Sequence, residues 1–207
     1  MSDTWHLVHT ERAALVAALE GLSPEEWKHP SLCPGWTVHD VAGHLVTNAL
    51  VTPFGLVRAM ARARFDFDRQ NDEGVRRGRG ATPQLTLQRL REVVGRTSGP
   101  PAPLDSRLVE EVLHGEDIRR PLGLRHDYAT EAAVRSLRYQ ARTSTAVGGA
   151  RQVAERVTLR ASDADVVLGS GPEVVGPVVS LAMVISGRTT ALADLDGPGV
   201  DTLVPGR

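Results

Sequence analysis

Apolar residues recur every three or four positions through most of residues 4–150, the spacing that places them on one face of a helix. Turn-forming and helix-capping residues separate these periodic stretches, so the connections between helices are short. The segments that we predict to be helical are 4–22, 24–29, 38–64, 82–94, 105–120 and 130–147. Consecutive amphipathic helices with short connections favour an antiparallel helical bundle.

Local signals mark several of the helix ends. Ser23-Pro24-Glu25-Glu26 has the form of a capping box with proline at the first helical position. Thr37 is expected to cap the long helix, with Asp40 bonding back to it. Pro53 should interrupt or kink that helix, because proline lacks the amide hydrogen that the helix needs. Residues 65–81 are charged and contain RRGRGA, so we expect a flexible loop there.

The pattern changes after Gly149. Residues 156–161 alternate between apolar and polar types, as a strand does, and 166–168 form a second apolar run. Residues 172–185 are apolar enough for a packed helix. A further strand is expected at 192–195.

These patterns predict a mainly α chain with two domains. A helical-bundle domain is expected over residues 1–150, and a small α+β C-terminal domain over residues 151–207. The sequence has no internal repeat and no low-complexity tract.

Composition narrows the classes of partner. The net charge is −1 and the pI is near 6.7, which gives no indication of a nucleic-acid partner. No run approaches the roughly 18 apolar residues of a membrane span, and the first residues lack the apolar core of a signal peptide. Cys33 is the only cysteine, which excludes an intrachain disulfide and a Cys-rich zinc site. We expect a cytoplasmic protein that does not bind membranes.

A glutamate and a histidine four residues apart are candidates for metal binding. Glu110 and His114 point the same way on the predicted helix, and Asp117 continues that face. A carboxylate and an imidazole placed in this way can share one metal ion. The signal is weak by itself, since Glu25 and His29 have the same spacing on a short helix that ends at Pro30 and is expected to be solvated.

His44 strengthens the hypothesis. It lies in the apolar stretch Val41-Ala42-Gly43-His44-Leu45-Val46 of the long predicted helix. A lone histidine on such a face is more often a satisfied core residue. Burying His44 together with Glu110 and His114, however, costs several kcal/mol unless the three are paired or coordinated. A metal held by these three side chains from facing helices satisfies all of them and leaves a fourth position open, the pattern of a catalytic site.

Other residues have weaker claims. Glu111, three residues before His114, is an alternative ligand to Glu110. Asp40 could orient His44, although a capping role is at least as good an interpretation. Asp117 could orient a ligand or pair with a neighbouring arginine. Cys33 could be a reactive thiol, but a buried turn cysteine is the more common case.

The runs LSPEEWKHPSLCPGWTVHDVAGHLV and EEVLHGEDIRRPLG resemble the metal-binding domain of the mycothiol-dependent maleylpyruvate isomerase family. The same resemblance places the chain in the broader DinB-like superfamily and implies a DinB-like four-helix bundle. The segment from about residue 155 to Arg188, which contains DADVVLGSGPEVVGPVVSLAMVISGR, resembles the small C-terminal domain of the family.

The resemblance implies a divalent metal, zinc in the family, on His44, Glu110 and His114, with mycothiol, an actinobacterial thiol, as cofactor. It also implies a catalytic arginine in the C-terminal domain, and Arg188 is the residue that matches. Glu110 rather than Glu111 is the ligand that it favours.

The function expected from these features is that of a metal-dependent enzyme in which the thiolate of a small cofactor adds to an electrophilic carbon of a small substrate. An isomerase would then release the thiol, and an S-transferase would keep the carbon–sulfur bond. Two alternatives stay open from the residues: a non-enzymatic metal- or ligand-binding module, and a hydrolase that uses zinc hydroxide.

Overall fold

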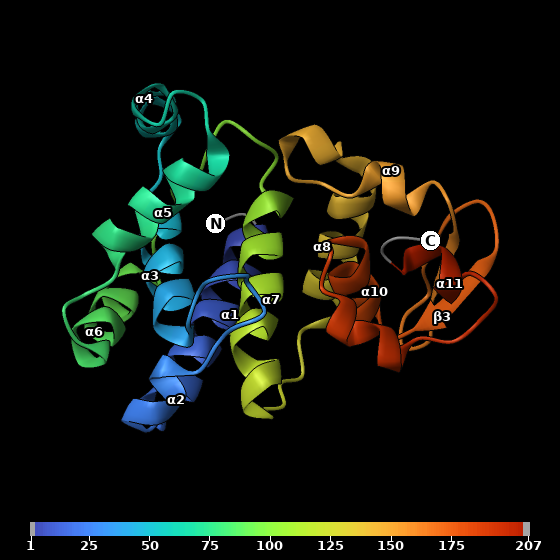
Figure 1. Ribbon diagram of the computed structural model, residues 1–207, viewed down its shortest axis with the longest axis horizontal. Helices are drawn as coiled ribbons and strands as arrows, with labels where there is room; N and C mark the ends of the chain where they lie inside the picture. The colour runs from blue at the N-terminus through green and yellow to red at the C-terminus, as the bar shows by residue number, and fades with distance from the viewer. Residues whose placement is uncertain (1–2, 205–207) are drawn as a thin grey trace. The chain divides into compact units, whose positions relative to one another are not determined.

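The computed structural model describes residues 3–204, which form two compact units that divide between Asp127 and Tyr128 (Figure 1). The helices of the first unit are α1 (Asp3–Glu20), α2 (Pro24–Lys28), α3 (Val38–Ala49), α4 (Pro53–Arg62), α5 (Phe67–Gly78), α6 (Pro83–Val93), α7 (Asp105–Arg119) and the 3₁₀ turn η1 (Arg120–Leu122).

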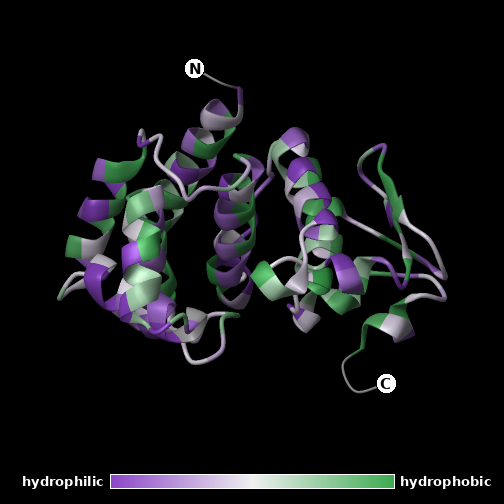
Figure 2. Ribbon diagram, turned by 90° about the horizontal axis from the view of Figure 1, so that it is seen from above, coloured by the Kyte–Doolittle hydropathy of each residue, from purple (hydrophilic) through white to green (hydrophobic). Residues whose placement is uncertain are grey.

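Four helices of the first unit make a bundle. α1 packs against α7 and α6, and α3 packs against the same two helices, so that the four close around one core. Figure 2 shows hydrophobic and hydrophilic residues alternating along the helical ribbons, as expected for helices with one buried face. Leu15, Leu19, Val41 and Leu45 are among the side chains that fill this core. The bundle therefore places α3 beside α7 over much of their length.

Capping boxes fix the starts of α2 and α3, as predicted. At α3 the Thr37 hydroxyl accepts the Asp40 amide hydrogen, and the Asp40 carboxylate accepts that of Thr37 at 3.0 Å. Such caps satisfy amide groups that the first helical turn leaves without partners. The defined start of α3 sets which side chains face α7 two turns later, and His44 is one of them.

The long helix expected over 38–64 is two helices. α3 ends at Ala49, and α4 starts at Pro53, with the Thr52 side chain accepting the Gly55 amide hydrogen. The proline interrupts the helix, as expected, and α4 then begins as a helix with its own cap.

The prediction of a flexible loop over 65–81 is wrong, because most of that segment is the helix α5. Arg69, Asp72, Arg76 and Arg77 of α5 are exposed, and its glycines allow its backbone to lie close to α3. A Cβ atom at residue 78 would be 2.0 Å from the carbonyl oxygen of Gly43. The Thr47 hydroxyl also donates to the carbonyl of Gly74, at 2.7 Å. A glycine that sequence analysis takes for flexibility is here a packing residue.

The second unit combines helices with a small sheet. Its elements are α8 (Thr130–Arg142), η2 (Thr145–Val147), α9 (Arg151–Ala154), β1 (Thr158–Ala161), β2 (Val167–Gly169), β3 (Glu173–Gly176), α10 (Val178–Ile185), η3 (Thr189–Asp194) and α11 (Val200–Leu203). The strand order is β2-β1-β3, with β1 antiparallel to β2 and parallel to β3. The apolar helix α10 packs against α8 and β1.

Several expectations for this unit need correction. The segment 172–185 contains β3 before α10, so only its second half is helical. The strand expected at 192–195 is mostly the 3₁₀ helix η3. By their contacts the two units divide between Asp127 and Tyr128, since α8 packs with α10, whereas the domain boundary predicted from the sequence lies at residue 150.

The expected fold class, a mainly α chain with a helical bundle followed by a small α+β part, is confirmed. Within residues 3–204, no helix has both the length and the apolar character needed to cross a bilayer.

Candidate metal centre

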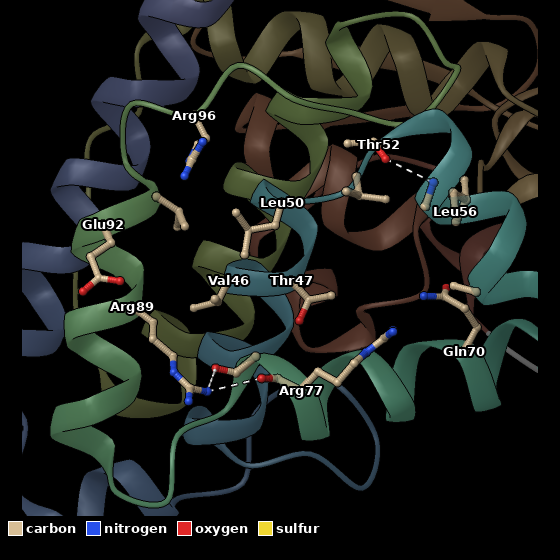
Figure 3. Close-up of a pocket in the computed structure, with 15 residues that line it drawn as sticks. Val46, Thr47, Leu50, Thr52, Leu56, Gln70, Arg77, Arg89, Glu92 and Arg96 are labelled. Carbon is tan, nitrogen blue, oxygen red and sulfur yellow. Dashed lines mark hydrogen bonds between the residues drawn. The ribbon is translucent and has the colours of Figure 1, made fainter. Parts of the chain in front are cut away.

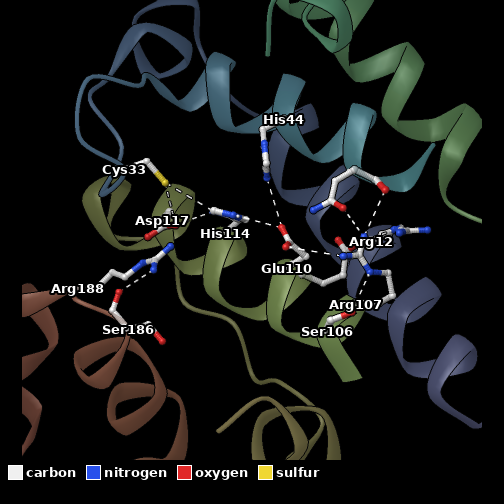
Figure 4. A network of polar contacts seen from close by, with 12 residues as sticks. Arg12, Cys33, His44, Ser106, Arg107, Glu110, His114, Asp117, Ser186 and Arg188 are labelled. Atoms are coloured by element: carbon white, nitrogen blue, oxygen red, sulfur yellow. Dashed lines mark hydrogen bonds and ion pairs between the residues drawn. The ribbon is translucent and has the colours of Figure 1, made fainter. Parts of the chain in front are cut away.

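Three side chains predicted to share a metal lie together in the core of the first unit (Figure 4). His44 comes from α3, and Glu110 and His114 come from successive turns of α7. The Nε2 atoms of both histidines are 3.4 Å from Oε2 of Glu110, and the two rings are 4.8 Å apart at their centroids. The structure thus brings together residues separated by 66 positions in the chain.

The spacing of these atoms fits a divalent metal ion. Zinc binds imidazole nitrogen and carboxylate oxygen at about 2.0–2.2 Å, so two ligand atoms in a tetrahedral arrangement lie roughly 3.3–3.6 Å apart. Both histidine–glutamate separations are within this range. The side chains of His44, His114 and Glu110 are 13%, 16% and 26% exposed, so a fourth ligand has access to the group.

The second nitrogen of His114 has its own partners. Nδ1 lies 2.8 Å from Oδ2 of Asp117, whose side chain is fully buried. The Cys33 thiol donates to the same oxygen at 3.1 Å, and its sulfur is 3.6 Å from Nδ1. A carboxylate on the far nitrogen of a ligating histidine keeps the hydrogen there and leaves the near nitrogen free for a metal. Asp117 therefore orients His114, one of the two roles considered for it.

The other oxygen of Glu110 faces a buried arginine. Nη2 of Arg107 is 3.9 Å from Oε1 of Glu110, and the Arg107 side chain is 5% exposed. Arg107 Nη1 donates to the carbonyl oxygen of Asn48 at 3.4 Å and also to the Asn48 side-chain oxygen. The arginine joins the end of α3 to α7 and places a positive charge behind the carboxylate.

The electrostatics of the group agree with metal-ligand chemistry. Burial by itself would raise the pKa of Glu110, but hydrogen bonds with His114 and His44 hold that pKa well below its usual value. Burial would lower the pKa of His114, whereas hydrogen bonds with Asp117, Cys33 and Glu110 raise it well above the usual value. Burial, the charge of His114 and that of Arg107 lower the pKa of His44. The raised pKa means that a proton on His114 competes with a cation for this group.

The rival candidates have other partners. Glu111 accepts from Arg12 Nε at 2.7 Å in a buried ion pair, so it faces α1 rather than the histidines. Asp40 caps α3 and pairs with Arg79. His29 is exposed, and its Nδ1 contacts the carbonyl of Pro30 at 2.8 Å.

Arg188 belongs to the second unit. It follows α10, and its Nη1 donates to the carbonyl oxygen of Ser186 at 2.9 Å.

Sequence reasoning missed several neighbours of the group. The indole ring of Trp36 lies 5.2 Å from the His44 ring, Arg107 supports Glu110, and Cys33 reaches the far side of His114. For Arg107 a sequence signal existed, because it lies three residues before Glu110 on the predicted helix and so on the same face.

Comparison with known proteins agrees with the fold. The family model of the mycothiol maleylpyruvate isomerase N-terminal domain matches residues 8–107. The crystal structure of the mycothiol-dependent maleylpyruvate isomerase and that of its histidine-to-alanine mutant each superpose with a TM-score of 0.67. Their sequence identities are 16% and 15%, and each alignment covers 95% of this chain and 92% of the other. No curated protein matches the chain.

The family match includes His44 and ends three residues before Glu110. Glu110 and His114 lie outside this match, so they are candidate ligands on the basis of their geometry.

Proposed function

Because the chain belongs, through residues 8–107, to the mycothiol maleylpyruvate isomerase N-terminal domain family, we propose that it is a metal-dependent enzyme that uses a low-molecular-weight thiol such as mycothiol. Its reaction is an isomerisation or an S-transfer on a small electrophilic substrate. We place this activity in the cytoplasm. The observation that carries the proposal is the convergence of His44, Glu110 and His114 with an accessible side.

Each residue of the group has a defined part in the proposal. His44, Glu110 and His114 hold a divalent ion, with zinc the first candidate because it favours this ligand set. Asp117 keeps the hydrogen on Nδ1 of His114, and Arg107 holds the Glu110 carboxylate in place. A divalent ion held there would lower the pKa of a thiol that approaches the open side, which makes a thiolate available at neutral pH.

Arg188 is the proposed catalytic residue of the second unit, on the strength of the family resemblance. Its hydrogen bond to Ser186 gives the guanidinium a fixed attachment at the end of α10. Arg188→Ala should lower turnover while leaving the metal content unchanged. Arg188→Lys should recover part of the turnover if a positive charge is what the reaction needs.

A titration of cobalt-substituted protein tests the proposal directly. Mycothiol, or a surrogate thiol, should produce sulfur-to-metal charge-transfer bands, and His44→Ala should remove them. An alcohol with the same carbon skeleton serves as the control and should leave the spectrum without such bands. A spectrum that stays unchanged with thiol at every pH would refute the use of a thiol.

A hydrolase that activates water is the second candidate, because two histidines and a glutamate are also the ligand set of zinc hydrolases. The two functions differ in their dependence on thiol. Hydrolysis of an activated ester at the same rate with and without thiol would favour the hydrolase.

A further inference from the structure

The first unit contains a cavity of about 510 Å³ that is separate from the candidate metal ligands (Figure 3). It lies between the C-terminal half of α3 and helices α4, α5 and α6, and its lining does not include His44, Glu110 or His114. Its volume is in the range of small-molecule sites in proteins.

One part of the cavity wall is apolar. Val46, Leu50 and Val51 contribute from the end of α3, and Leu56 and Ala59 contribute from the inner face of α4. Leu50 is 48% exposed, a high value for a leucine between helices, because the cavity lies beside it. A hydrocarbon or aromatic group placed there would cover apolar surface that the chain itself leaves in contact with water.

Most of the polar side chains of the lining are already hydrogen-bonded to the backbone. The Thr47 hydroxyl donates to the Gly74 carbonyl, and the Thr52 hydroxyl accepts the Gly55 amide hydrogen. Arg89 donates to the carbonyls of residues 77, 78 and 79 at 3.0–3.2 Å, so it closes the C-terminal end of α5.

Two arginines keep unused donors. Arg77 donates through Nε to the Glu73 carbonyl, and its terminal nitrogens have no hydrogen-bond partner among the described residues. Arg96 is bonded through its backbone: its amide donates to the Val93 carbonyl, and its carbonyl accepts from Arg12. Among the described residues, neither forms an ion pair with a carboxylate. Figure 3 shows Arg96 and Arg77 on opposite sides of Leu50 and Val46. The acidic side chain of the lining, Glu92, accepts from Gln88 at 3.1 Å. The donors available to a ligand are therefore the guanidinium groups of Arg77 and Arg96 and the neutral amide of Gln70, and the two charged groups border an apolar surface.

We propose that this cavity binds an amphipathic anion: a small molecule with an apolar body and one carboxylate, sulfonate or phosphate. The apolar body packs against α3 and the inner face of α4, and the anionic group pairs with Arg77 or Arg96. This site is independent of the proposed metal centre, so either proposal can fail without the other.

A pair of fluorescent probes tests the two halves of the site. The probes are 1-anilinonaphthalene-8-sulfonate, which is an apolar anion, and N-phenyl-1-naphthylamine, its neutral analogue. The intact protein should bind the sulfonate at one equivalent, and decanoate should displace it. Treatment with EDTA, or His114→Ala, should change the sulfonate affinity less than twofold, because the metal ligands do not line the cavity.

Variants of the lining assign the contributions. The double variant Arg77→Gln/Arg96→Gln should weaken sulfonate binding at least tenfold and change binding of the neutral probe less than twofold. Ala59→Trp should weaken both probes, because the indole occupies the cavity. Arg76→Gln, the matched control on α5, removes an exposed arginine that does not line the cavity and should change neither.

Three results would overturn the proposal: no binding of the sulfonate, equal weakening of both probes in the double-arginine variant, or an unchanged sulfonate affinity in that variant. The double variant changes only exposed side chains and should fold. It therefore tests the proposal even if Ala59→Trp does not fold. Cooperative thermal unfolding of each variant excludes probe binding to a partly unfolded state.

Discussion

His114 is the residue on which the candidate centre depends most, because both of its ring nitrogens have defined partners. Nε2 faces Glu110, and Nδ1 faces Asp117 and Cys33.

The first prediction follows from this position of His114. The purified protein should carry one equivalent of zinc by elemental analysis, and His44→Ala or His114→Ala should abolish it. His29→Ala has the same change on an exposed ring and should keep the full metal content. Full zinc occupancy in both core variants would disprove the ligand assignment.

A second prediction concerns the partners of His114 Nδ1. Asp117→Asn removes the carboxylate that holds the hydrogen on Nδ1, and it should weaken zinc binding by about 10–100-fold. Cys33→Ser keeps a donor to Asp117, so the zinc affinity should stay within a few fold of the wild-type value. Competition with a chromophoric chelator measures both affinities. A larger loss in the serine variant than in the asparagine variant would make Cys33 a ligand.

The pKa shifts of the histidines predict how zinc binding depends on pH. His114 has a raised pKa, so the metal-free protein holds a proton there that zinc must displace. Zinc affinity should therefore rise with pH until the raised pKa of His114 is passed, and then level off. Conversely, stabilisation of the metal-free fold by protonated His114 is present at low pH and is lost as the pH rises through that pKa. Calorimetry in buffers of different ionisation enthalpy should show proton release on binding, and none above the plateau.

At the scale of elements, capping signals were predictable from the sequence and α5 was not. Ser23 and Thr37 cap their helices through hydrogen bonds with residues three positions further along the chain, so these caps can be recognised from local sequence. α5 has an unfavourable composition for a helix and is stabilised by its contact with α3. That contact depends on glycines, and a single sequence does not distinguish a glycine in a loop from one at a helix crossing.

Gly78 allows a direct test of this explanation. A methyl group there would collide with the Gly43 carbonyl, a backbone atom that cannot move aside by rotation. Gly78→Ala should lower the free energy of unfolding by about 1–3 kcal/mol, although alanine favours helices. Gly21→Ala is the control, because its added Cβ has no atom within 4 Å. Denaturant unfolding compares the two, and equal stability would show that α5 does not pack closely on α3.

At the scale of the whole molecule, the sequence predicted the bundle and the three facing ligands but not their neighbours. His44 and Glu110 were predicted to meet because both lie on core faces of adjacent helices. The contacts of Cys33 with Asp117 and of Arg107 with Asn48 join positions 84 and 59 residues apart. Such contacts depend on the rotation of each helix about its axis and on its position along that axis. The periodicity of apolar residues predicts neither to better than about one residue. The candidate ligands therefore followed from the helical pattern together with the family resemblance, which favoured Glu110 over Glu111, whereas their neighbours required the three-dimensional arrangement.

Metal binding should also stabilise the first unit as a whole, because its ligands come from α3 and α7, which unfolding separates. A ligand that binds only the folded state adds about 2.7 kcal/mol to the free energy of unfolding at a free concentration of 100 times its Kd. Zinc buffered at that level should raise the midpoint of thermal unfolding by several degrees over EDTA-treated protein. The increase should shrink at lower pH, where the proton on His114 competes. His44→Ala should unfold at the same temperature with and without zinc. An equal zinc-dependent increase in His44→Ala would place the stabilising ion at another site.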